Sequence, residues 1–134
     1  MKRVYIDTPV WRDYFAGRNP ELADRVDELI SQQLARVSDA VLQELLAQAH
    51  DTATFDRLNE ALLGVYERAP ASESQVAALA GRMACRLREE GLAPLPPLRL
   101  RSAAAALDAR APLLTSDAAL HAVARFFPLK ILCA

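Results

Sequence analysis

The sequence has few of the residues that build crosslinked, metal-stapled or membrane-spanning proteins. Its two cysteines, Cys85 and Cys133, are too few and too far apart for a disulfide framework or a zinc site, and we expect both to be small buried side chains. The two histidines, His50 and His121, lack the spacing of metal ligands. No apolar run approaches the roughly 18 residues of a membrane-spanning helix, so we expect no membrane contact.

The sequence also has few glycines and almost no net charge. The four glycines are scattered, and none forms a glycine-rich loop after a strand, which disfavours a doubly wound nucleotide-binding domain. Lys and Arg number 16 against 17 Asp and Glu, for a formal net charge of −1. The overall charge therefore gives no sign of a protein that coats nucleic acid, and any such binding would need a local basic patch.

What remains is the composition of one folded domain. The 134 residues are 52% hydrophobic and 25% charged, which suits a single globular core spanning residues 1–134. No long apolar segment follows the basic residues at the start of the sequence before Asp7, so we expect no signal peptide and a cytoplasmic location.

Buried strands alternate with amphipathic helices along the sequence. The patterns predict strands over residues 3–6, 36–38, 65–68, 112–115 and 129–133. They predict helices over residues 8–16, 20–34, 41–49, 52–63, 72–90, 100–109 and 117–126. Because the strands alternate with helices, the order favours an α/β fold with a parallel sheet flanked by helices.

Some patterns favour packing or capping over binding. Trp11, Tyr14 and Phe15 recur at helical spacing, which predicts a core face, although three aromatic rings could also stack RNA bases. Ser72 and Gln75 have capping-box spacing, which predicts the start of the helix over residues 72–90.

Acidic residues follow several of the predicted strands. Asp7 comes directly after the first strand, Asp39 after the second and Asp117 after the strand over residues 112–115, while Glu44 lies further along a helix. Carboxyl ends of parallel strands meet at one edge of a sheet, where ligands bind, and clustered carboxylates favour a hard cation such as Mg²⁺ or Mn²⁺. Asp117 could instead be a helix N-cap, and Glu44 by itself reads as a surface residue.

Three segments together resemble one family. "VYIDTPVWRDYF" at residues 4–15 resembles the opening of PIN domains, the fold of bacterial VapC-type toxin ribonucleases. "SDAVLQELLAQA" at residues 38–49 is similar to the segment with the family's second acid, which falls on Glu44. "SAAAALDARAPLLTSDAAL" at residues 102–120 resembles the Ala-rich helix, fourth strand and last acidic loop, and places the last acid on Asp117.

The resemblance implies a PIN-like doubly wound sheet in which the strand over residues 3–6 lies between those over residues 36–38 and 112–115. It also implies a dimeric endoribonuclease of a toxin–antitoxin pair, acting on RNA with Mg²⁺ or Mn²⁺ and restrained by a small antitoxin protein. The implied catalytic and metal-binding residues are Asp7, Glu44 and Asp117, with Thr8 or Ser116 positioning water or substrate.

One position departs from the family pattern. PIN domains carry an aspartate where the Ala-rich helix opens, and counting back from "APLLTSD" places Arg99 there. No Asp or Glu lies between Glu90 and Asp108, so a small shift of alignment does not supply the acid. A guanidinium there could pair with Asp7 or Asp117 and close the site. Metal would then bind weakly or not at all, and the alternative function is an inactive PIN-like module that binds nucleic acid or protein.

Basic residues near the same edge are candidates for RNA contacts. The proposed fold brings Arg12, Arg99 and Arg101 towards the acidic edge, which makes Arg12 and Arg101 candidate phosphate-binding residues. A solvated helix face is the other interpretation of such arginines.

Overall fold

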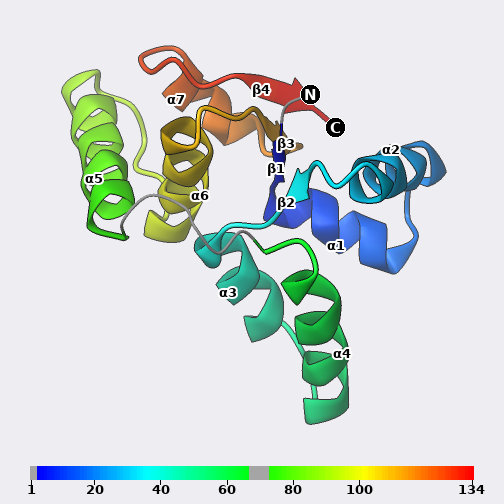
Figure 1. Ribbon diagram of the computed structural model, residues 1–134. Helices are drawn as coiled ribbons and strands as arrows, with labels where there is room; N and C mark the ends of the chain where they lie inside the picture. The colour runs from blue at the N-terminus through cyan, green and yellow to red at the C-terminus, as the bar shows by residue number, and fades with distance from the viewer. Residues whose placement is uncertain (1–2, 67–72) are drawn as a thin grey trace.

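The computed structural model describes residues 3–66 and 73–134. Its sheet contains β1 (Val4–Ile6), β2 (Ala35–Arg36), β3 (Leu113–Thr115) and β4 (Ile131–Cys133), in the order β2-β1-β3-β4 (Figure 1). The pairs that join these strands are all parallel. The predicted parallel α/β sheet is confirmed, and β1 lies between β2 and β3 as the resemblance implied.

Helices connect and flank these strands. They are α1 (Thr8–Ala16), α2 (Pro20–Ser31), α3 (Asp39–Ala47), α4 (Thr52–Leu63), α5 (Glu73–Glu89), α6 (Pro97–Asp108), the 3₁₀ turn η1 (Ala118–Leu120) and α7 (His121–Ala124). Several begin at N-cap residues: the side chains of Asn19, Ser38 and Asp51 accept hydrogen bonds from backbone N–H groups of the first turns. Gly17 ends α1 in the left-handed region, with φ of 66°.

The sheet is covered on both faces, because successive strand residues point to opposite sides. Tyr5 and Leu113 pack with α5, α6 and α7 on one side (Figure 1). Val4, Ile6 and Leu114 pack on the other side with α1, α2, α3 and α4. Both faces are therefore apolar, which explains why the strands read as unbroken hydrophobic runs.

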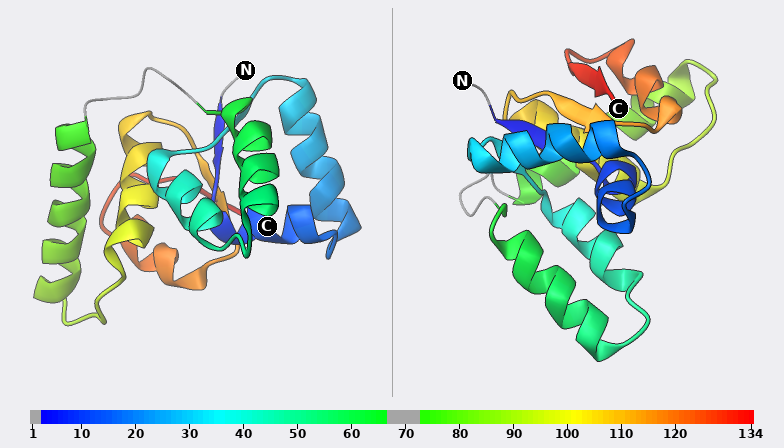
Figure 2. Two further views of the ribbon diagram at one scale, coloured as in Figure 1. Left: turned by 90° about the horizontal axis from the view of Figure 1, so that it is seen from below. Right: turned by 90° about the vertical axis from the view of Figure 1, so that its right-hand side faces the viewer.

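The two helical layers meet beyond the carboxyl ends of β1 and β3. Here α3 packs against both α1 and α6. Helix α4 packs on α3 and extends away from the sheet, as Figure 1 and the right-hand view of Figure 2 show. Two of the predicted acidic residues, Asp7 and Glu44, lie at this junction of α1, α3 and α6.

The structure corrects several sequence-based expectations of secondary structure. Residues 67 and 68 of the strand predicted over residues 65–68 lie outside the described part of the chain, and within the described part Tyr66 forms an isolated bridge to Val37. Helix α6 begins three residues earlier than predicted, because Pro97 at its first turn starts a helix without needing its missing N–H. The last predicted helix divides into η1 and α7. Ser72, the predicted cap of α5, also lies outside the described residues.

Two burial expectations are wrong. Cys85 and Cys133 are both exposed, because one lies on the outer face of α5 and the other at the end of the edge strand β4. In the aromatic group Trp11 is buried as predicted, but Phe15 is 41% exposed and stacks on the Trp11 ring.

Among the described residues, no helix is both long enough and apolar enough to cross a membrane.

Candidate functional site

The site is built on Asp7, the residue that follows β1. Its backbone N–H donates to the Leu114 carbonyl at 2.9 Å, so the pairing of β1 with β3 continues to this residue. Asp7 is completely buried, at 0% exposure. A buried carboxylate is costly unless hydrogen bonds or a cation compensate for its lost hydration, so its partners define the site.

Both carboxylate oxygens of Asp7 accept hydrogen bonds. Ser102 Oγ on α6 donates to Oδ1 at 2.8 Å, and Thr115 Oγ1 at the end of β3 donates to Oδ2 at 2.7 Å. The Arg99 guanidinium donates to Oδ1 through Nη2 and forms an ion pair with Asp7. One face of α6 thus supplies both a hydroxyl and a cation to the same carboxylate.

Glu44 is the second acid of the cluster and comes from α3. Its Oε1 accepts a hydrogen bond from Thr8 Oγ1 at 2.7 Å. Its Oε2 lies 3.7 Å from Arg99 Nε, within ion-pair distance. Arg99 therefore bridges the two acids, and its own side chain is only 13% exposed.

The position of Arg99 in α6 is unfavourable by local criteria. It lies in the first turn of the helix, which begins at Pro97 and contains no acidic residue. The N-terminal end of a helix carries partial positive charge, so a cation there costs typically about 0.3–1 kcal/mol. The ion pairs with Asp7 and Glu44 supply the compensation that the helix itself lacks.

Asp117 lies at the edge of this cluster, at the start of η1. Its Oδ1 accepts the Ala119 N–H at 3.0 Å, so it caps η1, as the alternative interpretation of this residue predicted. Its backbone N–H donates to Thr115 Oγ1 at 3.0 Å. Thr115 therefore connects Asp117 to Asp7 through two successive hydrogen bonds.

The remaining predicted site residues are arranged less closely. The Thr8 hydroxyl is engaged with Glu44, while Ser116 and Arg12 are exposed. Arg101 points to another side of α6, where its Nη2 lies 3.9 Å from Glu73 on α5. The structure thus gathers Asp7, Glu44, Thr8 and Arg99 into the cluster.

Ser102 and Thr115 hold Asp7 in place, yet the sequence interpretation did not select them. The sequence does contain a pattern that could have identified Ser102 as a site residue. Its hydroxyl stands next to a run of alanines, three residues after Arg99 and therefore on the same helical face. Thr115 ends a strand whose neighbours are leucines, so its hydroxyl is the polar group that reaches the sheet edge.

These residues, as arranged, do not fit a divalent cation. Such an ion needs several carboxylate oxygens directed at one point, but the Arg99 guanidinium occupies the space between Asp7 and Glu44. Within residues 3–66 and 73–134, no three His, Cys, Asp or Glu side chains are grouped as metal ligands would be. The cluster is instead an ion-pair and hydrogen-bond network in which the guanidinium supplies the positive charge.

Comparisons with known proteins identify the fold. No family model matches the sequence, and no curated protein matches it significantly. VapBC2 from Rickettsia felis, solved with a DNA fragment from its promoter, is 16% identical with a TM-score of 0.76, covering 98% of each chain. VapBC-1 from nontypeable Haemophilus influenzae is 21% identical with a TM-score of 0.75, covering 97% of this chain and 96% of the other.

A third match is to VapBC-5 from Mycobacterium tuberculosis, a member of the VapBC family of toxin–antitoxin systems. It is 19% identical, with a TM-score of 0.66 and full coverage of both chains. With the observed strand order, these matches show that the chain has the PIN-domain fold of VapC-like toxins, as the resemblance predicted. In this chain an arginine lies between two of the acids of the centre.

Proposed function

We propose that this chain is a VapC-like member of a toxin–antitoxin pair, acting in the cytoplasm by binding a small antitoxin-type protein. We further propose that its acidic centre does not carry out metal-dependent RNA cleavage while Arg99 fills it. The observation that carries the proposal is the guanidinium held between Asp7 and Glu44. The structural neighbours support the partner, because VapBC-5 is described as a member of the VapBC family of toxin–antitoxin systems.

Electrostatics supports a centre that does not need metal. Arg99 neutralises one of the two carboxylates that it contacts, and Ser102 and Thr115 donate to the carboxylate oxygens of Asp7. A divalent cation would have to displace a buried guanidinium and break these hydrogen bonds. Removing one partner of a buried ion pair typically costs about 3–5 kcal/mol, and that cost would be subtracted from the binding of the metal.

Calorimetric titration of the parent chain with Mn²⁺ tests the state of the centre. We expect no saturable heat, and we expect the Asp7→Asn variant to give the same titration as the parent. Stoichiometric Mn²⁺ binding that Asp7→Asn abolishes would refute the arginine-filled centre.

The second candidate is a dimeric, Mg²⁺- or Mn²⁺-dependent endoribonuclease. It is favoured because Asp7, Glu44 and Asp117 are all present where the family resemblance expects acids. Arg99→Asp separates the two candidates, because it restores the missing acid and removes the competing cation. We expect Mg²⁺-dependent cleavage of a mixed RNA by Arg99→Asp and none by the parent.

The control for this assay is Asp7→Asn/Arg99→Asp, which we expect to be inactive. If the parent cleaves RNA as fast as Arg99→Asp and both need Asp7, the endoribonuclease is the correct function and position 99 is not required.

The proposed partner is tested with the neighbouring gene. A short reading frame next to this one should encode a protein that co-purifies with the chain in a defined stoichiometry, measured by light scattering, which also reports whether the chain is a homodimer. The absence of such a reading frame, or a product that does not bind, would contradict the toxin–antitoxin assignment.

A further inference from the structure

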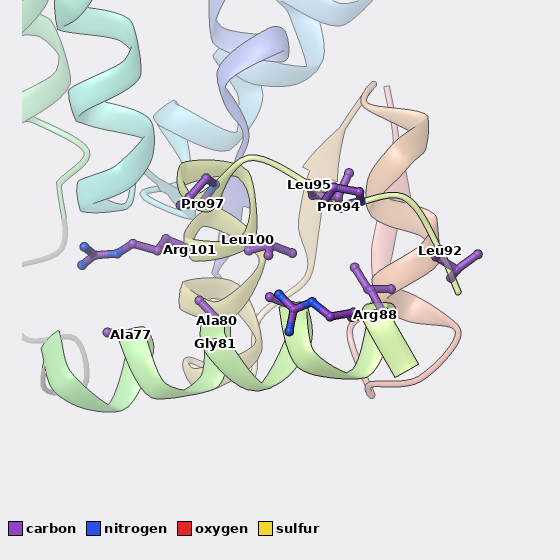
Figure 3. A pocket seen from close by; sticks show the side chains of 12 residues that line it. Ala77, Ala80, Gly81, Arg88, Leu92, Pro94, Leu95, Pro97, Leu100 and Arg101 are labelled. Carbon is purple, nitrogen blue, oxygen red and sulfur yellow. The ribbon is translucent and has the colours of Figure 1, made fainter. Parts of the chain in front are cut away.

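An apolar groove lies between α5 and the chain that leads into α6 (Figure 3). Its volume is about 500 Å³, within the usual range for ligand-binding cavities. It is separate from the acidic centre, although both involve the first turn of α6: Arg99 contacts Asp7, while Leu100 and Arg101 line the groove.

One wall of the groove is a strip of small residues on α5. They recur at positions i, i+3, i+4 and i+7, so they share one helical face: Ala77, Ala80, Gly81 and Ala84. A Cβ added at Gly81 would meet no atom within 4 Å. Short side chains leave room for groups from another molecule to approach the α5 backbone.

The opposite wall is rigid and apolar. It includes Leu92, Leu95 and Leu100, with Pro94 and Pro97 between them (Figure 3). Proline fixes φ near −65°, so this wall is held in shape without a partner. A preformed apolar surface loses less conformational entropy on binding than a flexible one.

The charged residues of the groove are both cations. Arg88 and Arg101 extend from different parts of its rim (Figure 3), and none of the lining residues in the described part of the chain is acidic. Within the same described residues, Arg101 Nε is buried without a hydrogen-bond partner. The contact from Arg101 to Glu73 is long, at 3.9 Å, and Glu73 is 82% exposed. Arg101 can therefore donate hydrogen bonds to a carboxylate of another molecule, and Arg88 is exposed at the rim of the groove.

We propose that this groove binds an acidic amphipathic segment of a partner protein. Aliphatic side chains of the segment occupy the space beside Gly81 and Leu100, and Asp or Glu residues pair with Arg88 and Arg101. This inference rests on the proposed function, because it assigns a surface to the protein partner. Arg101 is thereby a residue for protein recognition instead of the phosphate-binding residue that the sequence suggested.

A defined peptide probe tests the groove. The probe is a fluorescein-labelled helical peptide with leucines at three- and four-residue spacing and glutamates on both sides of them. The matched peptide carries lysines in place of the glutamates. We expect fluorescence anisotropy to show saturable binding of the acidic peptide to the full chain, and binding at least about tenfold weaker for the lysine peptide.

Matched variants locate the binding. Arg88→Glu/Arg101→Glu reverses the charge of the rim, and Gly81→Leu fills the groove. Each change should weaken the binding of the acidic peptide at least about tenfold. Arg82→Glu is the control, because Arg82 is exposed on the same helix and does not line the groove. Circular dichroism and Tm verify that each variant is folded. The inference is overturned if both peptides bind equally well or if the parent binds neither. It is also overturned if Arg82→Glu weakens the binding of the acidic peptide as much as the groove variants do.

The failure of the groove can be distinguished from failure of the proposed function. If the neighbouring gene's product binds the parent and Arg88→Glu/Arg101→Glu equally well, the groove is not the partner site, although the toxin–antitoxin assignment stands. If that product binds neither chain, the assignment fails. The binding of the acidic peptide to the parent chain and to its groove variants then shows independently whether the groove binds an acidic segment.

Discussion

Arg99 and Asp7 form a buried ion pair whose two members depend on each other. Replacing Arg99 with Met leaves the Asp7 carboxylate buried without its cation, so we expect Arg99→Met to lower the free energy of unfolding by about 3–5 kcal/mol. Urea denaturation measures this change. The double variant Asp7→Asn/Arg99→Met should recover most of the loss, because neither charge then remains. A loss below about 1 kcal/mol in the single variant would show that the buried Asp7 carboxylate does not depend on Arg99.

Tyr14 offers a second test at the residue scale. Its hydroxyl donates to Asp27 Oδ1 at 2.5 Å, and this hydrogen bond, together with partial burial and the Asp27 charge, raises the pKa of Tyr14 to about 12. The folded state therefore retains the phenol proton more tightly than the unfolded chain, whose Tyr pKa is about 10. The resulting stability is complete below about pH 10 and is lost as the pH rises through 12.

The measurement is a titration of tyrosinate absorbance in the folded protein. We expect Tyr14→Phe to remove a component that titrates near pH 12, and Asp27→Asn to move that component to lower pH. If Tyr14→Phe removes a component near pH 10 instead, the raised pKa of Tyr14 is wrong.

At the scale of elements, two glycines with different backbones should respond in opposite ways. Gly17 ends α1 at φ of 66°, where a side chain costs roughly 1–2 kcal/mol, so we expect Gly17→Ala to destabilise by about that amount. Gly81 lies inside α5 with open space for a Cβ, so Gly81→Ala should stabilise by about 0.5–1 kcal/mol. Parallel urea denaturation curves compare the two. If both variants change the free energy of unfolding in the same direction, the backbone conformation assigned to one of the two glycines is wrong.

The elements themselves were largely accessible from the sequence. Residues 52–63 were predicted as a helix, and α4 spans them, because Asp51 provides a local N-cap and the apolar periodicity is regular. Of the strand expected at residues 65–68, the described part of the chain contains residues 65 and 66, and there Tyr66 forms one isolated bridge to Val37. A short apolar run can suit several environments, and only its neighbours decide whether it joins a sheet.

At the scale of the whole molecule, metal ions should affect thermal stability only when position 99 is acidic. We expect the Tm of the parent to be equal in EDTA and in saturating Mn²⁺. Arg99→Asp should melt lower than the parent in EDTA, since clustered carboxylates repel, and recover by several degrees with Mn²⁺ because a ligand that binds the folded state stabilises it. Differential scanning calorimetry provides the readout. A parent whose Tm rises with Mn²⁺ would indicate that metal binds despite Arg99.

The fold of the whole molecule is also shared by solved structures that differ widely in sequence. Chains of 16–21% identity share the fold across nearly their full length. Alternating buried strands and helices can be built from many apolar residues, so the fold persists while individual side chains change. The chemistry of the centre depends on single residues and does not follow from the fold.

The sequence alone determined the parallel α/β architecture and the place of Asp7 after the first strand, because these features depend on local periodicity and spacing, which a linear pattern contains. The resemblance to PIN domains added the expectation that Arg99 stands where those domains carry an acid. The tertiary structure decided that Arg99 pairs with Asp7, 92 residues away, and with Glu44 instead of Asp117. It also decided that Ser102 and Thr115 hold the buried carboxylate. Those contacts arise where α6 packs against α3 beyond the sheet edge, and no local preference of the chain encodes such a meeting.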